Sequence, residues 1–306
     1  MNSKDFVEPM LRSIAKTERH IKSEYGTKMV GVMDTIGAHP HFAMPQQPGV
    51  VTVISGRSAV DEMYKASVQL AAPQGSRLLS QLATDWYVFV DNVPTRLWIE
   101  DDRLLTVQTV TMFLTDDKNG LTGEFAWQRM YPPQTPPAGG SIPLPERELG
   151  NLEMHQALLD ALCKGDTGAL TGLLDPECIW VQRNYLSDVA GGAMTNLRGT
   201  AAVASHVAQW HKALNPEHVS ILNRRVTDWY VFSEELWVVR PDGGERRQYR
   251  TAAVYPVNEK GLFESALGFG RGIDALSPSA GSRMGISFYP SGVTADPECR
   301  TGYPEA

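Results

Sequence analysis

The side chains best suited to move protons lie in the first half of the chain. His39 and His41 flank Pro40, and histidine titrates close enough to neutrality to act as a base or an acid. In an extended segment both side chains point to the same face, so we expect His41 to carry the proton, with His39 orienting it and Phe42 beside it. The alternative is a pair of rim histidines on a proline-bearing loop.

Two other side chains could stabilise negative charge on a substrate oxygen. Tyr64 could donate its hydroxyl hydrogen to an oxyanion, although a helical tyrosine more often packs in the core. Arg129 shares a strand face with Phe125 and Trp127, an arrangement that could stack an aromatic ring and neutralise a phenolate or carboxylate. The alternative for Arg129 is an ion pair on the outside of a sheet.

The second half offers a comparable set of side chains: Tyr249, Arg250 and the pair His206 and Trp210, one helical turn apart. Such helical spacing more often marks an interface with a sheet than a site.

The pattern His-x-His at 39 and 41 also suggests a metal. A metal site needs three or four convergent ligands, and the sequence positions no third one. We therefore predict no metal and no cofactor.

An internal repeat sets the organisation that must position these residues. Residues 84–89 and 227–232 both read Thr-Asp-Trp-Tyr-Val-Phe, and further glycine landmarks recur at nearly the same offset. The repeat predicts a first domain at 1–131, a Pro- and Gly-rich linker at 132–150, a second domain at 151–270 and an irregular tail at 271–306. Because Asp85 and Asp228 recur, we interpret them as structural, bonding a neighbouring backbone amide.

Each copy shows the same order of patterns. Apolar residues at helical spacing over 5–24 and 151–174 predict an opening helical hairpin. A short strand and a second helix, at 58–70 and 200–213, come next. The rest predicts strands at 77–90, 95–100, 104–115 and 121–131, and at 218–232, 235–240, 246–257 and 262–269.

Composition excludes several classes of function. The 28 basic and 35 acidic side chains give a net charge of −7, so we expect no nucleic-acid partner. The charged amino terminus and the lack of a long apolar run predict a cytoplasmic protein that neither enters nor spans a membrane. The three unpaired cysteines predict reduced packing residues.

This order of elements resembles the SnoaL-like, ketosteroid-isomerase-like superfamily, which is also described as nuclear-transport-factor-like. Residues 161–166, Ala-Leu-Cys-Lys-Gly-Asp, and the segment 172–180 look like that family's opening motif. The resemblance implies two tandem cone-shaped α+β domains, each a curved antiparallel sheet wrapped around helices. It also implies that the two repeats pair within the chain, with a homo-oligomer as a further option.

The family's catalytic positions are occupied by different residue types in the two copies. The family's acid–base aspartate falls on Cys163, and the ketosteroid isomerase base position falls near Gln182 in the second copy and on His41 in the first. We therefore expect the first copy to hold the working pocket. The resemblance implies a cofactor-independent lyase or isomerase acting on a small, apolar, aromatic molecule, by dehydration or by the deformylation of lignin-derived diarylpropanes that similar bacterial lyases perform. The alternative is a non-catalytic binding or dimerisation protein.

Overall fold

The computed structural model describes residues 4–25, 31–47, 50–116, 120–130, 144–183, 194–241, 244–273 and 286–287. The chain divides into two compact units. Unit 1 comprises Met1–Pro136 with Gly285–Ala306, and unit 2 comprises Pro137–Met284. No helix among the described residues is long and apolar enough to cross a membrane.

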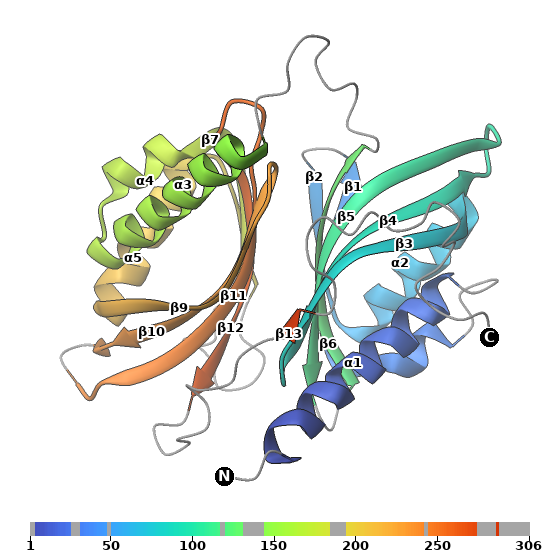
Figure 1. The fold of residues 1–306 in the computed structure, drawn as a ribbon, viewed down its shortest axis with the longest axis horizontal. Helices are drawn as coiled ribbons and strands as arrows, with labels where there is room; N and C mark the ends of the chain where they lie inside the picture. The colour runs from blue at the N-terminus through green and yellow to red at the C-terminus, as the bar shows by residue number, and fades with distance from the viewer. Residues whose placement is uncertain are drawn as a thin grey trace. The chain divides into compact units, whose positions relative to one another are not determined.

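Unit 1 packs its helices against one face of a curved sheet (Figure 1). Its elements are α1 (Lys4–Tyr25), the 3-10 turn η2 (Val32–Thr35), β1 (Ile36–Gln47), β2 (Val50–Ser55), α2 (Arg57–Leu70), β3 (Ala71–Ala83), β4 (Tyr87–Trp98), β5 (Arg103–Asp116) and β6 (Gly120–Met130). The strand order is β13-β3-β4-β5-β6-β1-β2, where β13 is Ile286–Ser287.

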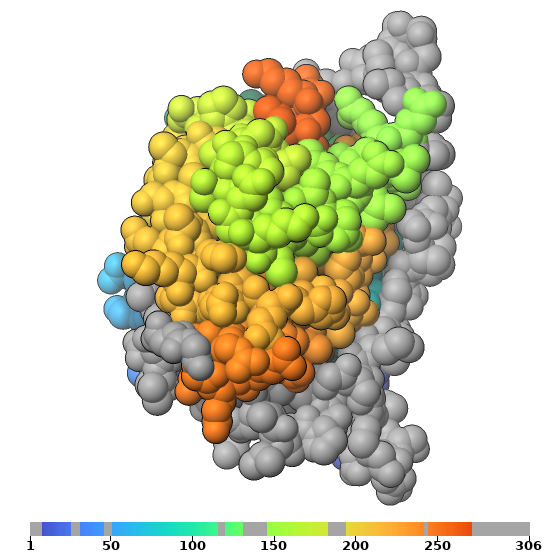
Figure 2. All heavy atoms as spheres, turned by 90° about the vertical axis from the view of Figure 1, so that its left-hand side faces the viewer, coloured from blue at the N-terminus to red at the C-terminus, as the bar shows by residue number. Residues whose placement is uncertain are grey.

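Unit 2 repeats this arrangement, and its helical side faces the viewer in Figure 2. Its elements are α3 (Leu144–Lys164), α4 (Thr167–Leu173), β7 (Leu174–Arg183), β8 (Met194–Arg198), α5 (Thr200–Leu214), β9 (Pro216–Val226), β10 (Tyr230–Val239), β11 (Arg247–Pro256) and β12 (Phe263–Ile273). The strand order is β8-β7-β12-β11-β10-β9.

The predicted fold class, two α+β copies in tandem, is confirmed. The sheets are mixed rather than purely antiparallel. β1 runs parallel to β6, and β7 runs parallel to β12. This pairing places the first strand of each unit beside its last long one, and so brings together side chains that are far apart in sequence.

The opening helices differ between the units. In unit 2 the predicted hairpin forms from α3 and α4, and Asp166 caps α4 by accepting a hydrogen bond from Ala169 N at 2.9 Å. In the described part of unit 1, one long helix is followed by the turn η2. A stripe of α1 at helical spacing is buried in unit 1: Met10, Ser13, Thr17, His20 and Ile21.

The repeated Thr-Asp-Trp-Tyr-Val-Phe motif is a turn between two strands. The prediction of continuous strands at 77–90 and 218–232 was wrong, because each chain segment reverses at the motif. Thr84 N donates to Tyr87 O at 2.9 Å, and Thr84 Oγ1 accepts from Tyr87 N at 3.2 Å. Thr227 and Tyr230 form the same pair of bonds. These threonines bond the neighbouring amides, the role that the sequence pattern assigned to Asp85 and Asp228.

Several regions named from sequence fall partly outside the described residues. Helix α3 begins at Leu144, within the stretch interpreted as linker, and β13 pairs with β3 from within the stretch interpreted as tail. Cys163 and Cys178 are free thiols, whereas Cys299 lies outside the described residues.

Candidate functional site

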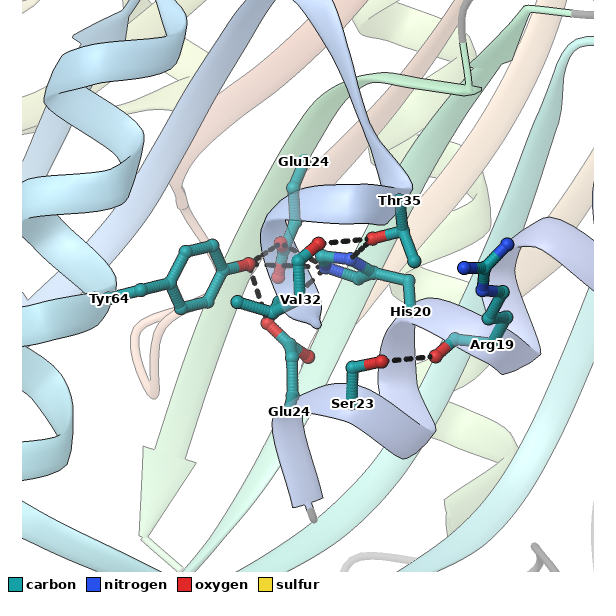
Figure 3. Close-up of polar contacts among 8 residues, drawn as sticks. All are labelled: Arg19, His20, Ser23, Glu24, Val32, Thr35, Tyr64 and Glu124. Atoms are coloured by element: carbon teal, nitrogen blue, oxygen red, sulfur yellow. Dashed lines mark hydrogen bonds and ion pairs between the residues drawn. The ribbon is translucent and has the colours of Figure 1, made fainter. Parts of the chain in front are cut away.

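A buried polar cluster lies between the helices and the sheet of unit 1 (Figure 3). It is formed by His20 and Glu24 from α1, Tyr64 from α2 and Glu124 from β6, and we call it the acid–base cluster. The side chains of His20 and Glu124 are 0% and 5% exposed, whereas that of Glu24 is 13% exposed. Three titratable groups and a phenol are thus held largely out of water.

The other three side chains converge on the hydroxyl group of Tyr64. Tyr64 Oη donates to Glu24 Oε1 at 2.7 Å and lies 3.3 Å from Glu124 Oε2 and 3.1 Å from His20 Nε2. His20 Nε2 lies 3.4 Å from Glu24 Oε1 and 3.5 Å from Glu124 Oε2. A proton on any of these atoms has an acceptor within reach.

Thr35 fixes one proton of His20. The Thr35 hydroxyl donates to Val32 O at 2.6 Å, so its oxygen is left to accept from His20 Nδ1 at 2.7 Å. Nδ1 therefore carries a hydrogen, and Nε2 is the nitrogen that gains or loses a proton toward the carboxylates.

The electrostatics of the cluster shift the pKa values of its members in different directions. Burial alone would lower the pKa of His20, but the charge of Glu24 and hydrogen bonds to both carboxylates raise it to about 9. Burial, together with the charge of Glu24, raises the pKa of Glu124 to about 7, against the opposing effect of His20. Burial would raise the pKa of Glu24, yet the His20 charge lowers it overall. Burial and both carboxylates raise the pKa of Tyr64.

The same atoms could also hold a divalent cation. His20 Nε2 and one oxygen from each of Glu24 and Glu124 lie within 4.8 Å of one another, which is a nitrogen-and-oxygen ligand set that several metals accept. A proton shared among the three groups accounts for the same geometry.

A second candidate feature is a cavity in unit 2, between the helices and the sheet. Its volume is about 50 Å³. Six aromatic rings line it, and we call it the aromatic cavity: Trp180, Trp210, Trp237, Tyr249, Tyr255 and Phe269. His206 and Gln182 also line it.

Among the residues predicted as catalytic or substrate-binding in unit 1, the structure brings Tyr64 and Phe42 together. Phe42 is buried and contacts Tyr64 edge-on, with ring centroids 6.2 Å apart. Because side chains alternate along β1, His39 and His41 point to the face opposite Phe42. His41 is part-exposed and its Nδ1 lies 3.0 Å from Ser55 Oγ, so it does not join the acid–base cluster.

Arg129, Phe125 and Trp127 also lie away from the acid–base cluster. Alternation along β6 places them on the sheet face opposite Glu124. Arg129 donates from Nε and Nη2 to Gln108 Oε1 at 3.0 and 2.9 Å. The three share a face of the sheet, as expected, but it is the face opposite the one that Tyr64 contacts through Glu124.

In unit 2, the structure brings together three of the four residues that the sequence suggested there. His206, Trp210 and Tyr249 line the aromatic cavity. Arg250 is adjacent to Tyr249 on β11 and therefore points to the other face, where it pairs with Glu234.

Sequence reasoning missed His20, Glu24 and Glu124. His20 and Glu24 stand one helical turn apart and extend the spacing of the buried stripe of α1. Polar residues at the buried positions of an amphipathic helix could therefore have indicated this cluster. No local pattern marks Glu124, which lies opposite Phe42 only through the parallel pairing of β1 and β6.

Comparison with known proteins finds similar solved structures at low sequence identity. No protein-family model and no curated protein matches the chain. Similar solved structures include a putative isomerase from Bacillus subtilis, at 13% identity and a TM-score of 0.35, which covers 41% of this chain and 88% of that one. An LEH-like epoxide hydrolase from Mycobacterium tuberculosis has 15% identity and a TM-score of 0.33, with 40% and 84% covered.

A third similar structure is a hypothetical protein with a ketosteroid isomerase-like fold from Catenulispora acidiphila. It has 18% identity and a TM-score of 0.32, with 38% of this chain and 83% of that chain covered. Each match spans about one unit. The α+β arrangement of each unit is established by its own elements and strand order, and the likeness to these structures concerns the fold alone.

Proposed function

We propose that unit 1 is a cofactor-independent acid–base catalyst, an isomerase or lyase, in which Glu124 transfers the proton. The observation that supports this proposal is the buried Glu124 carboxyl group, whose pKa is raised to about 7 beside Tyr64 and His20. A carboxyl group with such a pKa is half ionised near neutrality, so it can both accept and return a proton.

The neighbours of Glu124 supply the complementary part of the chemistry. When Glu124 removes a proton from carbon next to a carbonyl group, the electron pair moves onto the carbonyl oxygen and forms an enolate. Tyr64 Oη lies 3.1 Å from His20 Nε2. Protonated His20 can donate to the enolate oxygen, and Tyr64 can do so once its hydrogen turns away from Glu24; such donors lower the barrier. Return of the proton to another carbon completes an isomerisation, whereas departure of a leaving group completes a lyase reaction.

We propose a small, apolar, aromatic carbonyl or hydroxyl compound as the substrate. Phe42, edge-on to Tyr64, provides an apolar surface beside the cluster. A dehydration and a diarylpropane deformylation both require a proton carrier of this kind, so both belong in a substrate screen. The alternative is a binding protein, which is favoured by the mutual hydrogen bonds that already satisfy Tyr64, Glu24 and His20.

The proposal is tested by the exchange of substrate C–H protons for deuterium. A panel of aromatic ketones in D₂O would be followed by NMR, because this exchange reports proton abstraction before the product is known. Glu124→Gln is expected to reduce the exchange rate at least about 10²-fold, with the fold checked by a thermal melt. Glu100→Gln, which changes an exposed carboxylate of unit 1, is the matched control.

Other outcomes would reassign the site. His41→Ala is expected to change the rate less than about threefold, since His41 lies on the other face of β1; a loss of about 10²-fold would return the proton carrier to His41. Loss of activity on chelation would indicate that a cation occupies the three ligand atoms. Ligand binding without any exchange would favour the binding protein.

A further inference from the structure

The aromatic cavity of unit 2 contains polar groups that its surroundings do not satisfy. The hydroxyl of Tyr249 and the indole nitrogen of Trp180 are buried and donate to no partner among the described residues. Trp210 interacts with Tyr249 as a hydrogen-bond donor, so the Tyr249 hydroxyl hydrogen is still available to a ligand. Tyr249 and Trp180 line the cavity and are 4% and 2% exposed. A buried donor without an acceptor destabilises the folded protein, so a ligand that accepts from these groups is bound favourably.

The walls of the cavity suit a compact apolar body. Trp237 stacks on Tyr249 with an interplanar angle of 13°, and Trp210 stands at 87° to Trp237 with ring centroids 5.3 Å apart. These rings form walls at right angles to each other. By volume, the cavity holds about four water molecules, which corresponds to a ligand of few heavy atoms.

Charge around the cavity argues against an anionic ligand. No Lys, Arg, Asp or Glu is among the described residues that line it, and burial lowers the pKa of His206, which favours its neutral ring. Behind the wall, Trp237 Nε1 donates to Thr251 Oγ1 at 3.0 Å, and Thr251 donates to the buried Glu235 carboxylate. Burial, and after it the charge of Glu235, raises the pKa values of Tyr249 and Tyr255.

Two basic groups lie near Glu235 without pairing closely with it. His155 Nε2 is 3.8 Å from Glu235 Oε1, and Glu235 interacts by hydrogen bonds with Thr251 and Tyr255. The charge of Glu235 also acts on Arg224. Among the described residues that line the aromatic cavity there is no lysine or arginine to pair with a carboxylate or an enolate.

We propose that the aromatic cavity is a second binding site, for a small neutral molecule whose carbonyl oxygen accepts a hydrogen bond from Tyr249 or Trp180. This site lies in unit 2 and does not depend on the reaction proposed for unit 1. Gln182, which the sequence resemblance placed at a proton-transfer position, is a cavity-wall residue at this site.

The test measures binding to the full-length protein through the NMR signals of the tryptophan indole groups. The probes are cyclopentanone, cyclopentane, which lacks the acceptor, cyclobutanecarboxylate and tetramethylammonium. Tyr249→Phe is expected to weaken cyclopentanone binding about fivefold or more, while cyclopentane binding stays the same or strengthens. A merely structural role for Tyr249 would weaken both ketone and hydrocarbon.

His218→Ala is the matched control, because His218 is exposed on the same unit; both affinities should be unchanged in this variant. Trp180→Phe provides the second donor deletion, and the loss for cyclopentanone should appear in at least one of the two donor variants. The proposal is overturned if neither variant discriminates ketone from hydrocarbon. It is also overturned if cyclobutanecarboxylate or tetramethylammonium binds more tightly than cyclopentanone.

Discussion

His20 and Glu124 both hold protons more tightly than they would in water, for different physical reasons. The raised pKa of His20 comes from two nearby carboxylates that outweigh its burial. The raised pKa of Glu124 comes mainly from its own burial and from the charge of Glu24. At neutral pH an imidazolium therefore stands beside a carboxyl group that is close to half-protonation, which is the pairing that acid–base catalysis requires.

These shifts predict that unit 1 loses stability as the pH rises. The contribution of His20 is fully present below its unfolded pKa of 6.5 and is lost as the pH passes about 9. Glu124 acts in the same direction, since its stabilising protonated form is lost as the pH rises from 4.5 through about 7. Glu24, whose pKa is lowered, loses its contribution only as the pH falls below 4.5.

Thermal melts at pH 6 to 9 measure this loss. We expect the melting temperature of unit 1 to fall by about 5 °C or more over that range. Glu124→Gln should make the fall smaller because the variant removes one of the two titrating groups, whereas Glu100→Gln should retain it. A melting temperature that stays constant in the wild-type protein would contradict the opposing charges assigned to the cluster.

At the scale of elements, short-range sequence patterns predicted the turns and the starts of helices. The repeated glycines were informative: Gly56 and Gly199, which precede α2 and α5, have φ values of 92° and 84°, and Gly120 and Gly261 have 76° and 73°. Left-handed backbone favours glycine, so these positions recur in both copies. The acid–base cluster could not be predicted in this way, because it depends on which strands lie side by side.

The motif that revealed the repeat also yields a prediction about stability. Thr84→Ala removes the oxygen that accepts from Tyr87 N at 3.2 Å and leaves that buried amide with one bond fewer, so we expect a loss of about 1 kcal/mol. Thr84→Ser keeps the hydroxyl group and should lose less. Urea unfolding of both variants measures the difference, and equal losses would mean that the threonine methyl group, not its oxygen, stabilises the turn.

At the scale of the whole molecule, two copies of one fold have kept the same strand order and changed what their concave faces carry. Unit 1 carries the acid–base cluster under its helices, whereas unit 2 has the aromatic cavity there. The opening helix of each unit carries a fully buried histidine, His20 or His155, that lies near a buried glutamate. The copies thus share a polar feature: Tyr64 joins it in unit 1 through hydrogen bonds, and in unit 2 Tyr255 packs against His155 with ring centroids 5.1 Å apart. Pairing of the two repeats stays a prediction.

This divergence predicts that the two proposed activities can be removed separately. Glu124→Gln should abolish proton exchange and leave cyclopentanone binding within about twofold, because Glu124 belongs to unit 1. Tyr249→Phe should weaken cyclopentanone binding and leave exchange within about threefold, and Gln182→Ala should also leave exchange within that limit. These factors lie well below the 10²-fold loss expected from removing a proton carrier. Measuring proton exchange and cyclopentanone binding in all three variants shows which unit carries each activity. If exchange falls with Tyr249→Phe or Gln182→Ala while the protein remains folded, the reaction takes place in unit 2. The assignment of the working site to unit 1 would then be wrong.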